Sequence, residues 1–370
     1  MQRGSDFYSI LTNQDELAKI TNYVNSQFDN TAWRNFMTWD APQIDLTFGT
    51  LLKDYSISPM ASVIDSNAPK PEIGGDGFNT YYDSMPTIGL ATSLKKNDFR
   101  NIASLQASGL GDAEMLDKLY GSVEKVVRGA HNRINQMVFS GLTSGAIAIT
   151  ASNNPDGILF NLDLRIPSTN KIKAGFNQTT KAAWTDTTNS DPVQDLIDLY
   201  QKSVDEKHPF GVFYMSLARW NAFCKHPKVQ AWIRARLDIL NTTRAISSME
   251  VRNELAGFDL PPIVVVENKF TQMVDGQSVA ITDGFDTNIV VGAPVGMVGT
   301  IKNAIPASLL SGIPSTADAA FTYLENNRFA LLSKWDAMAI SHKVELEANL
   351  VPTINVPYNI YTLDTSQAAS

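Results

Sequence analysis

Four histidines are the side chains in this sequence best suited to binding a metal or transferring protons. No two of them have the spacing that metal ligands commonly show, and no His-Glu-x-x-His or Gly-x-Ser-x-Gly segment occurs. One of them, His342, lies on the apolar side of an alternating stretch, so we expect a core or interface residue there. The four are His131, His208, His226 and His342. The sequence predicts no catalytic, metal-binding or cofactor-binding residue among them.

Two carboxylates near the C-terminus could in principle form an acid–base pair. Glu345 and Glu347 fall on one side of an extended stretch, as a glycosidase pair could. Lys343 shares that side, which favours a solvated or inter-subunit charged face. The only cysteine, Cys224, has no neighbouring histidine–acid arrangement, so we expect a small buried side chain rather than a nucleophile.

Three aspartates surround the expected start of a helix near residue 191. Asp186, Asp191 and Asp195 stand where carboxylates stabilise the positive end of a helix dipole. A calcium site is the alternative, but the alternating oxygen ligands and turn glycine of an EF-hand loop are missing. The segment Gly74–Gly77 lacks the Gly-Lys-Ser/Thr ending of a phosphate-binding loop, so we expect a turn.

The composition is that of a folded protein, not a free nucleic-acid binder. The chain has 370 residues, of which 44% are hydrophobic and 18% charged, and its net charge is −8. Without a basic patch, any nearby DNA would be enclosed rather than tightly bound. The lone cysteine excludes an intramolecular disulfide and suits a reducing cytoplasm. No apolar run approaches the ~18 residues of a membrane span, and Met1–Ile10 does not read as a signal peptide.

The elements that would position these residues begin with one long amphipathic helix, predicted over residues 112–140. Asp112 can cap its start and Gly141 can end it. Apolar residues recur at steps of three and four, which is the helical period. They are Leu116, Leu119, Tyr120, Val123, Val126, Val127, Ala130, Ile134, Met137 and Val138.

The first hundred residues indicate an arm and an extended loop. Trp33, Phe36, Met37 and Trp39 form an aromatic-rich cluster, which we expect to dock on a neighbouring copy, although folding back onto its own domain stays open. Residues 46–98 are rich in glycine and proline between strand-like pieces. This spacing predicts a β-hairpin with its tip near Glu72–Gly77.

Strands and helices alternate over residues 190–315, which predicts a compact α/β domain. A helix is expected to start at Asp191 and Pro192, and a buried strand at Phe210–Met215 to lead into a helix capped by Ser216. Apolar and polar residues then alternate over Ala337–Leu350, which predicts a long strand closed by prolines. We expect the tail after Asp364 to be frayed.

From the long helix onward the chain resembles the major capsid proteins of tailed double-stranded DNA bacteriophages, in particular the lambda E-type family. The resemblance lies in the order and spacing of three regions, while the N-terminal third matches by architecture. The first region is Asn135–Gly141. The second is Ile166–Lys171 with Trp184 and Ser190–Leu196, and the third is Asn288–Thr300.

This resemblance implies an α+β protein with the Hong Kong 97-like capsid fold. Its parts would be an N-terminal arm, an extended β-hairpin loop, a peripheral domain with a long spine helix, and an α/β axial domain. On this chain they map to residues 1–45 for the arm, 46–98 for the loop, 99–190 with 316–370 for the peripheral domain (spine helix 112–140), and 191–315 for the axial domain.

The function implied by the resemblance is structural and not enzymatic. Copies of the chain would assemble into hexamers and pentamers that form the icosahedral head around the phage double-stranded DNA, without sequence-specific DNA binding or membrane association. Expected partners are scaffolding, portal and decoration proteins, and the protein would be part of the virion after assembly in the host cytoplasm. The alternative is an encapsulin-like shell, with the same fold but with cargo proteins inside.

Overall fold

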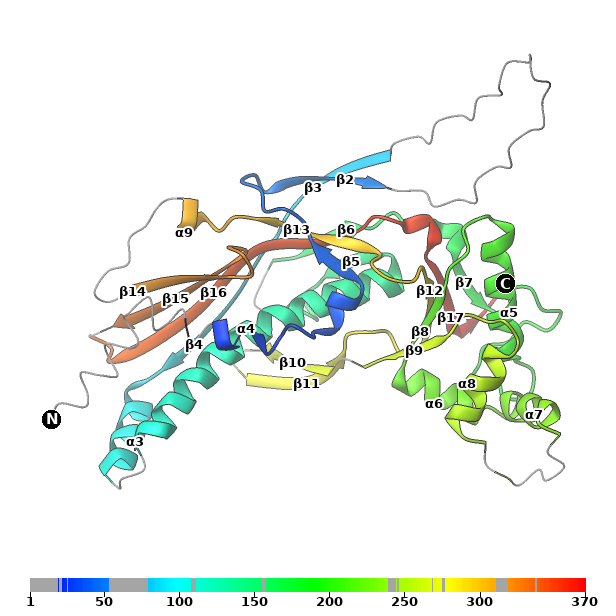
Figure 1. Cartoon of the computed structure of the whole chain (residues 1–370), viewed down its shortest axis with the longest axis horizontal. Coiled ribbons are helices and arrows are strands. Elements are labelled where there is room, and N and C mark those ends of the chain that lie inside the picture. Colours follow the sequence, from blue (N-terminus) through cyan, green and yellow to red (C-terminus); the bar gives the residue numbers. More distant parts are fainter. Residues whose placement is uncertain are drawn as a thin grey trace, which may run out of the picture. The chain divides into compact units, whose positions relative to one another are not determined.

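The computed structural model of the protein divides into two compact units (Figure 1). The structure describes residues 19, 22–24, 26–52, 79–107, 111–154, 158–238, 244, 246–267, 269–274, 277–310, 319–336 and 338–370. The first unit comprises Met1–Phe48, Tyr82–Gln136 and Thr300–Thr353, and the second Gly49–Tyr81, Met137–Gly299 and Ile354–Ser370. Each unit is therefore assembled from distant stretches of sequence. None of the helices within the described ranges is long and apolar enough to cross a membrane.

The first unit is built on a six-stranded sheet. Its strand order is β1-β13-β16-β15-β14, and β4 pairs with β16. The strands β4, β14 and β15 are joined to the sheet by antiparallel pairing. Strand bounds are β1 Met37–Trp39, β4 Thr87–Leu94, β13 Gly299–Ala304, β14 Ala319–Leu324, β15 Phe329–Asp336 and β16 Ser341–Ile354.

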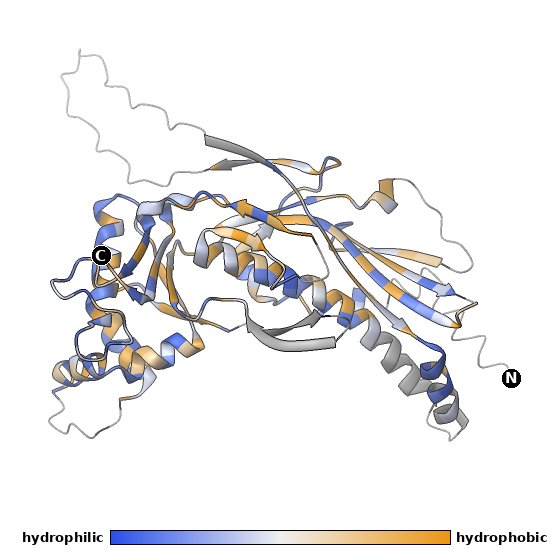
Figure 2. Ribbon diagram, turned by 180° about the vertical axis from the view of Figure 1, so that it is seen from behind, coloured by the Kyte–Doolittle hydropathy of each residue, from blue (hydrophilic) through white to orange (hydrophobic). Residues whose placement is uncertain are grey.

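Strand β16 has the alternation that the sequence predicts. His342, Val344 and Leu346 are buried, whereas Lys343 and Glu347 are exposed, and Figure 2 shows hydrophilic and hydrophobic residues alternating along the strands of this sheet. Successive residues of a strand point to opposite faces, so over residues 341–347 one face of β16 is apolar and the other is charged, whereas residues 348–354 are buried on both faces.

The bounds predicted for this strand were wrong at both ends. Residues 338–340 form a turn, in which the Asp336 carboxylate accepts the backbone N–H groups of Met338 and Ala339. Because of this turn, the strand begins at Ser341. At the other end the strand continues through Pro352 to Ile354, so only Pro357 closes it, at the start of a short 3-10 helix, η3 (Pro357–Asn359).

Helix α4 (Gly111–Ser144) is the predicted long helix, and α3 (Lys96–Ala107) precedes it. Val123, Val126, Val127 and Ile134 are completely buried, as the helical period indicated; the side chains of residues 105–120 lie outside the described part of the chain. The helix does not end at Gly141. It continues to Ser144 and is followed by Gly145, whose φ of 77° is a conformation that glycine adopts without steric cost.

The second unit is built on a five-stranded sheet in the order β7-β17-β12-β8-β9. The pairs β7–β17 and β8–β9 are parallel, and β12 is antiparallel to both of its neighbours. Strand bounds are β7 Lys171–Ala174, β8 Val212–Ser216, β9 Ile263–Val266, β12 Ile289–Ala293 and β17 Tyr361–Ala368. Helices and strands alternate here as predicted for residues 190–315, but the sheet also takes in β7 and β17 from outside that range. The tail after Asp364, expected to be frayed, is instead part of β17.

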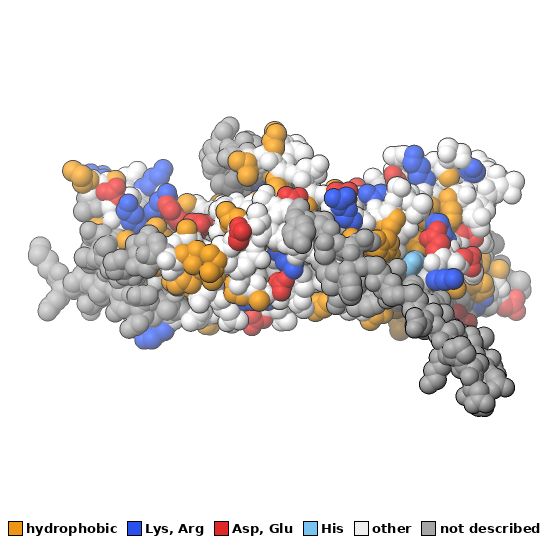
Figure 3. Space-filling view, turned by 90° about the horizontal axis from the view of Figure 1, so that it is seen from above, with side chains coloured by type: hydrophobic (Ala, Val, Ile, Leu, Met, Phe, Trp, Pro, Cys, Tyr) orange, Lys and Arg blue, Asp and Glu red, His pale blue; other side chains and the backbone are white. Residues whose placement is uncertain are grey.

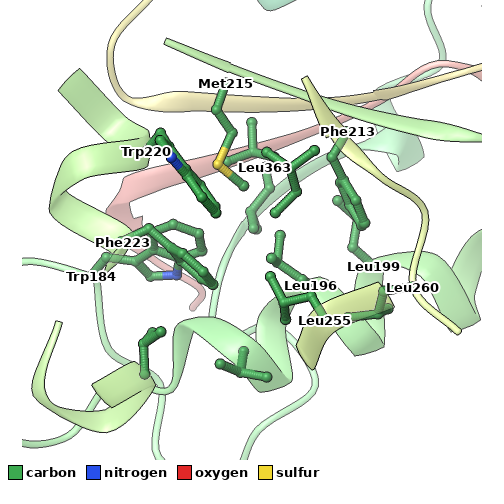
Figure 4. Packing of buried hydrophobic residues seen from close by; sticks show 14 of the residues in the cluster. Trp184, Leu196, Leu199, Phe213, Met215, Trp220, Phe223, Leu255, Leu260 and Leu363 are labelled. Atoms are coloured by element: carbon green, nitrogen blue, oxygen red, sulfur yellow. The ribbon is translucent and has the colours of Figure 1, made fainter. Parts of the chain in front are cut away.

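Four helices supply the other half of this core (Figure 4). They are α5 Pro192–Asp205, α6 Leu217–Lys225, α7 Pro227–Arg236 and α8 Ser248–Ala256. Their apolar residues pack on Phe213, Met215 and Leu363 of the sheet. Asp191 and Ser216 cap α5 and α6 through their side chains, as the sequence predicts.

The described residues also include three two-stranded sheets, three more short helices and helical residues at 22–24 and 26. Strands β2 and β3 form the base of the predicted hairpin, while its tip at residues 72–77 lies outside the described residues. The paired strands are β2 Thr47–Leu52 with β3 Asn79–Ser84, β5 Ala146–Ile149 with β6 Phe160–Asp163, and β10 Lys269–Val274 with β11 Gln277–Asp283. The short helices, besides η3, are η1 Ala32–Asn35, η2 Ser168–Asn170 and α9 Ala307–Leu310.

Candidate functional site

The structure does not bring the histidines together as metal ligands. His226 caps α7 by accepting the Lys228 backbone N–H, and its Nε2 lies 3.1 Å from the hydroxyl of Ser190. His208 stacks loosely against Tyr358. Within the described ranges, no group of three His, Cys, Asp or Glu side chains could hold a metal ion.

The other two histidines are buried in the first unit. His342 lies 2.7 Å from the hydroxyl of Ser333 through its Nε2, and burial lowers its pKa to about 4. His131 lies against Phe28 and Trp33, and burial also lowers its pKa to about 4. Both rings are therefore neutral at pH 7 and have the character of core residues, as expected for His342.

The aspartates near residue 191 are engaged by the protein itself. Asp195 is fully buried, and its carboxylate accepts hydrogen bonds from Gly175 N–H at 2.8 Å, Gln178 Nε2 at 2.8 Å and Trp184 Nε1 at 2.7 Å. Burial raises its pKa to about 6. Since Asp191 caps α5, the arrangement holds the loop before the helix and resembles no calcium loop.

Asp186 has a local role in the same loop. Its carboxylate accepts the backbone N–H groups of Thr188 and Asn189 and the side-chain amide of Asn189. These hydrogen bonds hold the pKa of Asp186 below its usual value. The residue therefore shapes the turn that leads toward α5.

The carboxylates of β16 lie on its polar face. Lys343 and Glu345 form an ion pair there, and Glu347 is exposed two residues further along. The residue opposite Lys343 on β15 is Lys334, so the face carries charges of both signs. Cys224 is buried, which raises the pKa of its thiol to about 11 and leaves it protonated at neutral pH.

A buried polar cluster, missed by the sequence analysis, attaches the N-terminal segment to the first unit. The Trp33 backbone N–H donates to Asn135 Oδ1 at 2.9 Å, and its ring N–H donates to His131 Nδ1 at 3.3 Å. Glu325, in the turn between β14 and β15, accepts from Arg34 at 2.6 Å and from Trp39 Nε1 at 2.9 Å. We call the segment 28–40, which makes these contacts, the N-terminal anchor.

The anchor corrects the expectation that its aromatics dock on a neighbouring copy. Trp33 is 1% exposed, and Phe36 and Met37 are 2% exposed, all within the first unit of the same chain. Asp40 extends the attachment through an ion pair with Lys302 on β13. Burial in a single chain leaves these side chains unavailable for a neighbour. Residues 1–18, 20, 21 and 25 of the predicted arm lie outside the described residues.

Exposed apolar residues follow the anchor. Ile44 is 72% exposed and Leu46 45% exposed, just before β2. On the face shown in Figure 3, basic and acidic side chains are interspersed between apolar ones.

Comparison with known proteins identifies the family. A model of the phage major capsid protein E family matches residues 16–324. The chain belongs to this family. The structure of this capsid protein is similar to that of a protein described as a prophage capsid protein, from Escherichia coli CFT073, with 12% identity over 95% of this chain and 98% of the other, and a TM-score of 0.55.

A phage-related protein from Bordetella bronchiseptica RB50 is also similar, with 13% identity over 94% of this chain and 96% of the other, and a TM-score of 0.50. No curated protein gives a significant match. The predicted α+β fold and the resemblance to phage capsid proteins are confirmed. As a phage capsid protein, the chain associates with copies of itself in a shell and is a component of the virion.

Proposed function

We propose that the chain assembles into hexamers and pentamers that together form an icosahedral head around double-stranded DNA. The observation that carries this proposal is the family match over residues 16–324, with a fold similar to a prophage capsid protein across nearly the whole chain. Rings of this kind arise when one heterologous contact repeats until it closes. The role is mechanical, and the proposal includes no catalytic step.

The parts of the chain would divide this work. We assign residues 1–45 to an N-terminal arm, 46–98 to an extended loop, 99–190 with 316–370 to a peripheral domain, and 191–315 to an axial domain, in a Hong Kong 97-like arrangement. The paired strands β2 and β3 support the loop assignment. Because Val24 and the anchor are buried within the chain, we do not assign these residues to contacts with a neighbouring copy.

Scaffolding, portal and decoration proteins are the proposed partners, and assembly would take place in the cytoplasm of the host bacterium. The net charge of −8 supports enclosure of DNA without sequence-specific binding, because an acidic surface gains little from phosphate contacts. Many modest contacts per copy would add through multivalency to a stable shell.

Electron microscopy of the chain, expressed with and without the scaffolding protein of its own phage, tests the proposal. The expected result is closed shells or separate capsomers with sixfold and fivefold symmetry. A chain that stays monomeric in both preparations, up to millimolar concentration, would contradict it.

An encapsulin-like shell around cargo proteins is the weaker alternative. The two functions differ in what purified particles contain. If the chain forms a phage head, particles from phage-infected cells should hold DNA of genome length and no stoichiometric cargo protein. An encapsulin-like shell should hold a cargo protein and no such DNA. Nuclease-resistant DNA and the protein composition of gradient-purified particles distinguish them.

A further inference from the structure

His131 lies in the middle of an aromatic cluster that includes two residues of the N-terminal anchor. Its ring stacks on Phe28 with the ring centres 5.2 Å apart and on Trp33 with the centres 6.2 Å apart. Phe329 of β15 meets the same ring edge-on at 5.6 Å. Since His131 itself belongs to α4, one imidazole contacts the anchor, the helix and the sheet.

The hydrogen bonding of this ring is compatible only with its neutral form. The Trp33 ring N–H donates to His131 Nδ1, so this nitrogen carries no proton. The other nitrogen, Nε2, is buried and has no hydrogen-bond partner among the described residues. A second proton would have to enter at Nδ1. The protonated Nδ1 would be a donor facing the Trp33 N–H donor, at a side chain that is 1% exposed.

The charges near the ring do not compensate for such a proton. Arg34 is on the anchor, Arg128 lies over Phe28 from α4, and Glu325 and Arg328 lie in the turn between β14 and β15. Glu325 already uses one oxygen for Arg34 and the other for Trp39. Burial therefore dominates and lowers the pKa of His131 to about 4, while Glu325 raises it and Arg34 lowers it further.

We propose that His131 is an acid-sensitive latch: its neutral ring holds the N-terminal anchor on α4 and β15, and a proton on Nδ1 releases residues 28–40. The latch is made of contacts within one chain, so it does not depend on the proposed assembly. In a shell it would make the attachment of the N-terminal segment responsive to pH.

The direction of the pH effect follows from the two states of the ring. Once released, the ring returns to the ordinary histidine pKa of 6.5, above the value of about 4 in the attached state. The attached state thus binds fewer protons between these pH values, and attachment weakens as the pH falls through that window. Each pH unit across it favours release about tenfold, so the full effect is roughly 10²-fold.

Hydrogen–deuterium exchange on the isolated full-length chain, corrected for the intrinsic rate at each pH, tests the latch. Between pH 6.5 and 4, protection of amides in residues 31–40 should fall roughly 10²-fold. Protection in β8 and β12 of the second unit should fall less. If the anchor stays as protected as these strands down to pH 4, the proposal is overturned.

Two substitutions at position 131 remove the titrating group in different ways. His131→Asn keeps an acceptor near the Nδ1 position, and His131→Phe keeps the aromatic stack. Exchange of residues 31–40 should lose its pH dependence in both variants, even if it is faster throughout. The matched control is His342→Gln, which removes the other buried histidine of the same unit and should leave the anchor pH-dependent. Unchanged acid release in both position-131 variants would refute the latch.

Discussion

Asp195 shows how a single side chain can look like a ligand in the sequence and act as a structural acceptor in the fold. Three donors from the preceding loop converge on its carboxylate, and no solvent reaches it. A buried donor that loses its acceptor costs about 1–3 kcal/mol. The residue therefore ties the loop at 175–184 to α5 by a mechanism that the clustering of aspartates in the sequence does not reveal.

Asp195→Ala should lower the free energy of unfolding by about 3 kcal/mol or more, because Gly175, Gln178 and Trp184 would all lose their shared acceptor. Urea unfolding of the unassembled chain measures this. The matched control is Asp205→Asn on the exposed side of the same helix, which should stay within about 0.5 kcal/mol of wild type. Equal effects of the two substitutions would rule out the proposed role of Asp195.

Stability should also depend on pH through Asp195. Its pKa of about 6 in the fold is above the ordinary value of 3.8, so the folded state binds more protons between these values. The stability coupled to this extra proton is complete below about pH 4 and is lost as the pH rises through 6, whereas the hydrogen bonds to the carboxylate remain. Asp195→Asn should remove this part of the pH dependence, as measured by urea unfolding at pH 4, 5, 6 and 7. A wild-type slope that survives in the variant would show that another group causes it.

At the scale of elements, the sequence predicted those helices and helix caps that depend on residues close together in the chain. Helix α4 was predictable because its apolar residues follow the helical period from Leu116 to Val138, about six turns. The caps of α5 and α6 were predictable because one side chain accepts a backbone N–H three residues away. The end of strand β17 was not predictable from the sequence, because this strand depends on parallel pairing with β7, nearly two hundred residues earlier.

The N-terminal anchor was missed for the same reason. Trp33 and His131 are 98 residues apart, and Arg34 and Glu325 are 291 apart. No periodicity links residues at such separations, although the aromatic cluster itself was visible. The sequence thus located the residues of the anchor but could not decide between a neighbouring copy and the chain's own core. The tertiary contacts in the structure decide between these two possibilities.

Two glycines of α4 offer a matched test of what surrounds this helix. A Cβ at Gly121 would meet nothing within 4 Å, whereas a Cβ at Gly129 would lie 2.4 Å from a methyl carbon of Leu90 on β4. Replacing glycine by alanine in a helix stabilises it by about 1 kcal/mol when nothing clashes. Gly121→Ala should therefore raise the free energy of unfolding by about that amount.

Gly129→Ala should gain less or lose stability, because Leu90 must move to admit the methyl group. The double variant Gly129→Ala with Leu90→Ala separates this clash from helix propensity. Thermal unfolding of the unassembled chain compares the variants. Equal gains from both single substitutions would mean that β4 does not pack against Gly129 as described.

At the scale of the whole molecule, the contacts between copies and the charge of the surface have separate roles. Contacts between copies would hold the shell together, so the surface that meets DNA need not attract it. The polar face of β15 and β16 carries charges of both signs, since Lys334 and Lys343 lie beside Glu345 and Glu347. With charges of both signs interspersed, the face offers no continuous basic track for a phosphate backbone.

The isolated chain should therefore not bind duplex DNA at physiological salt. Fluorescence anisotropy with a 20-base-pair duplex should show no saturable binding at micromolar protein concentrations. The contrasting variant is Glu345→Lys with Glu347→Lys, which would place four lysines together on adjacent strands. This variant should bind weakly, and its affinity should fall steeply with salt, since each neutralised phosphate adds about 0.9 to the logarithmic slope. Tight, salt-sensitive binding by the wild-type chain would instead mean that it holds its DNA by direct electrostatic contact, and passive enclosure would have to be given up.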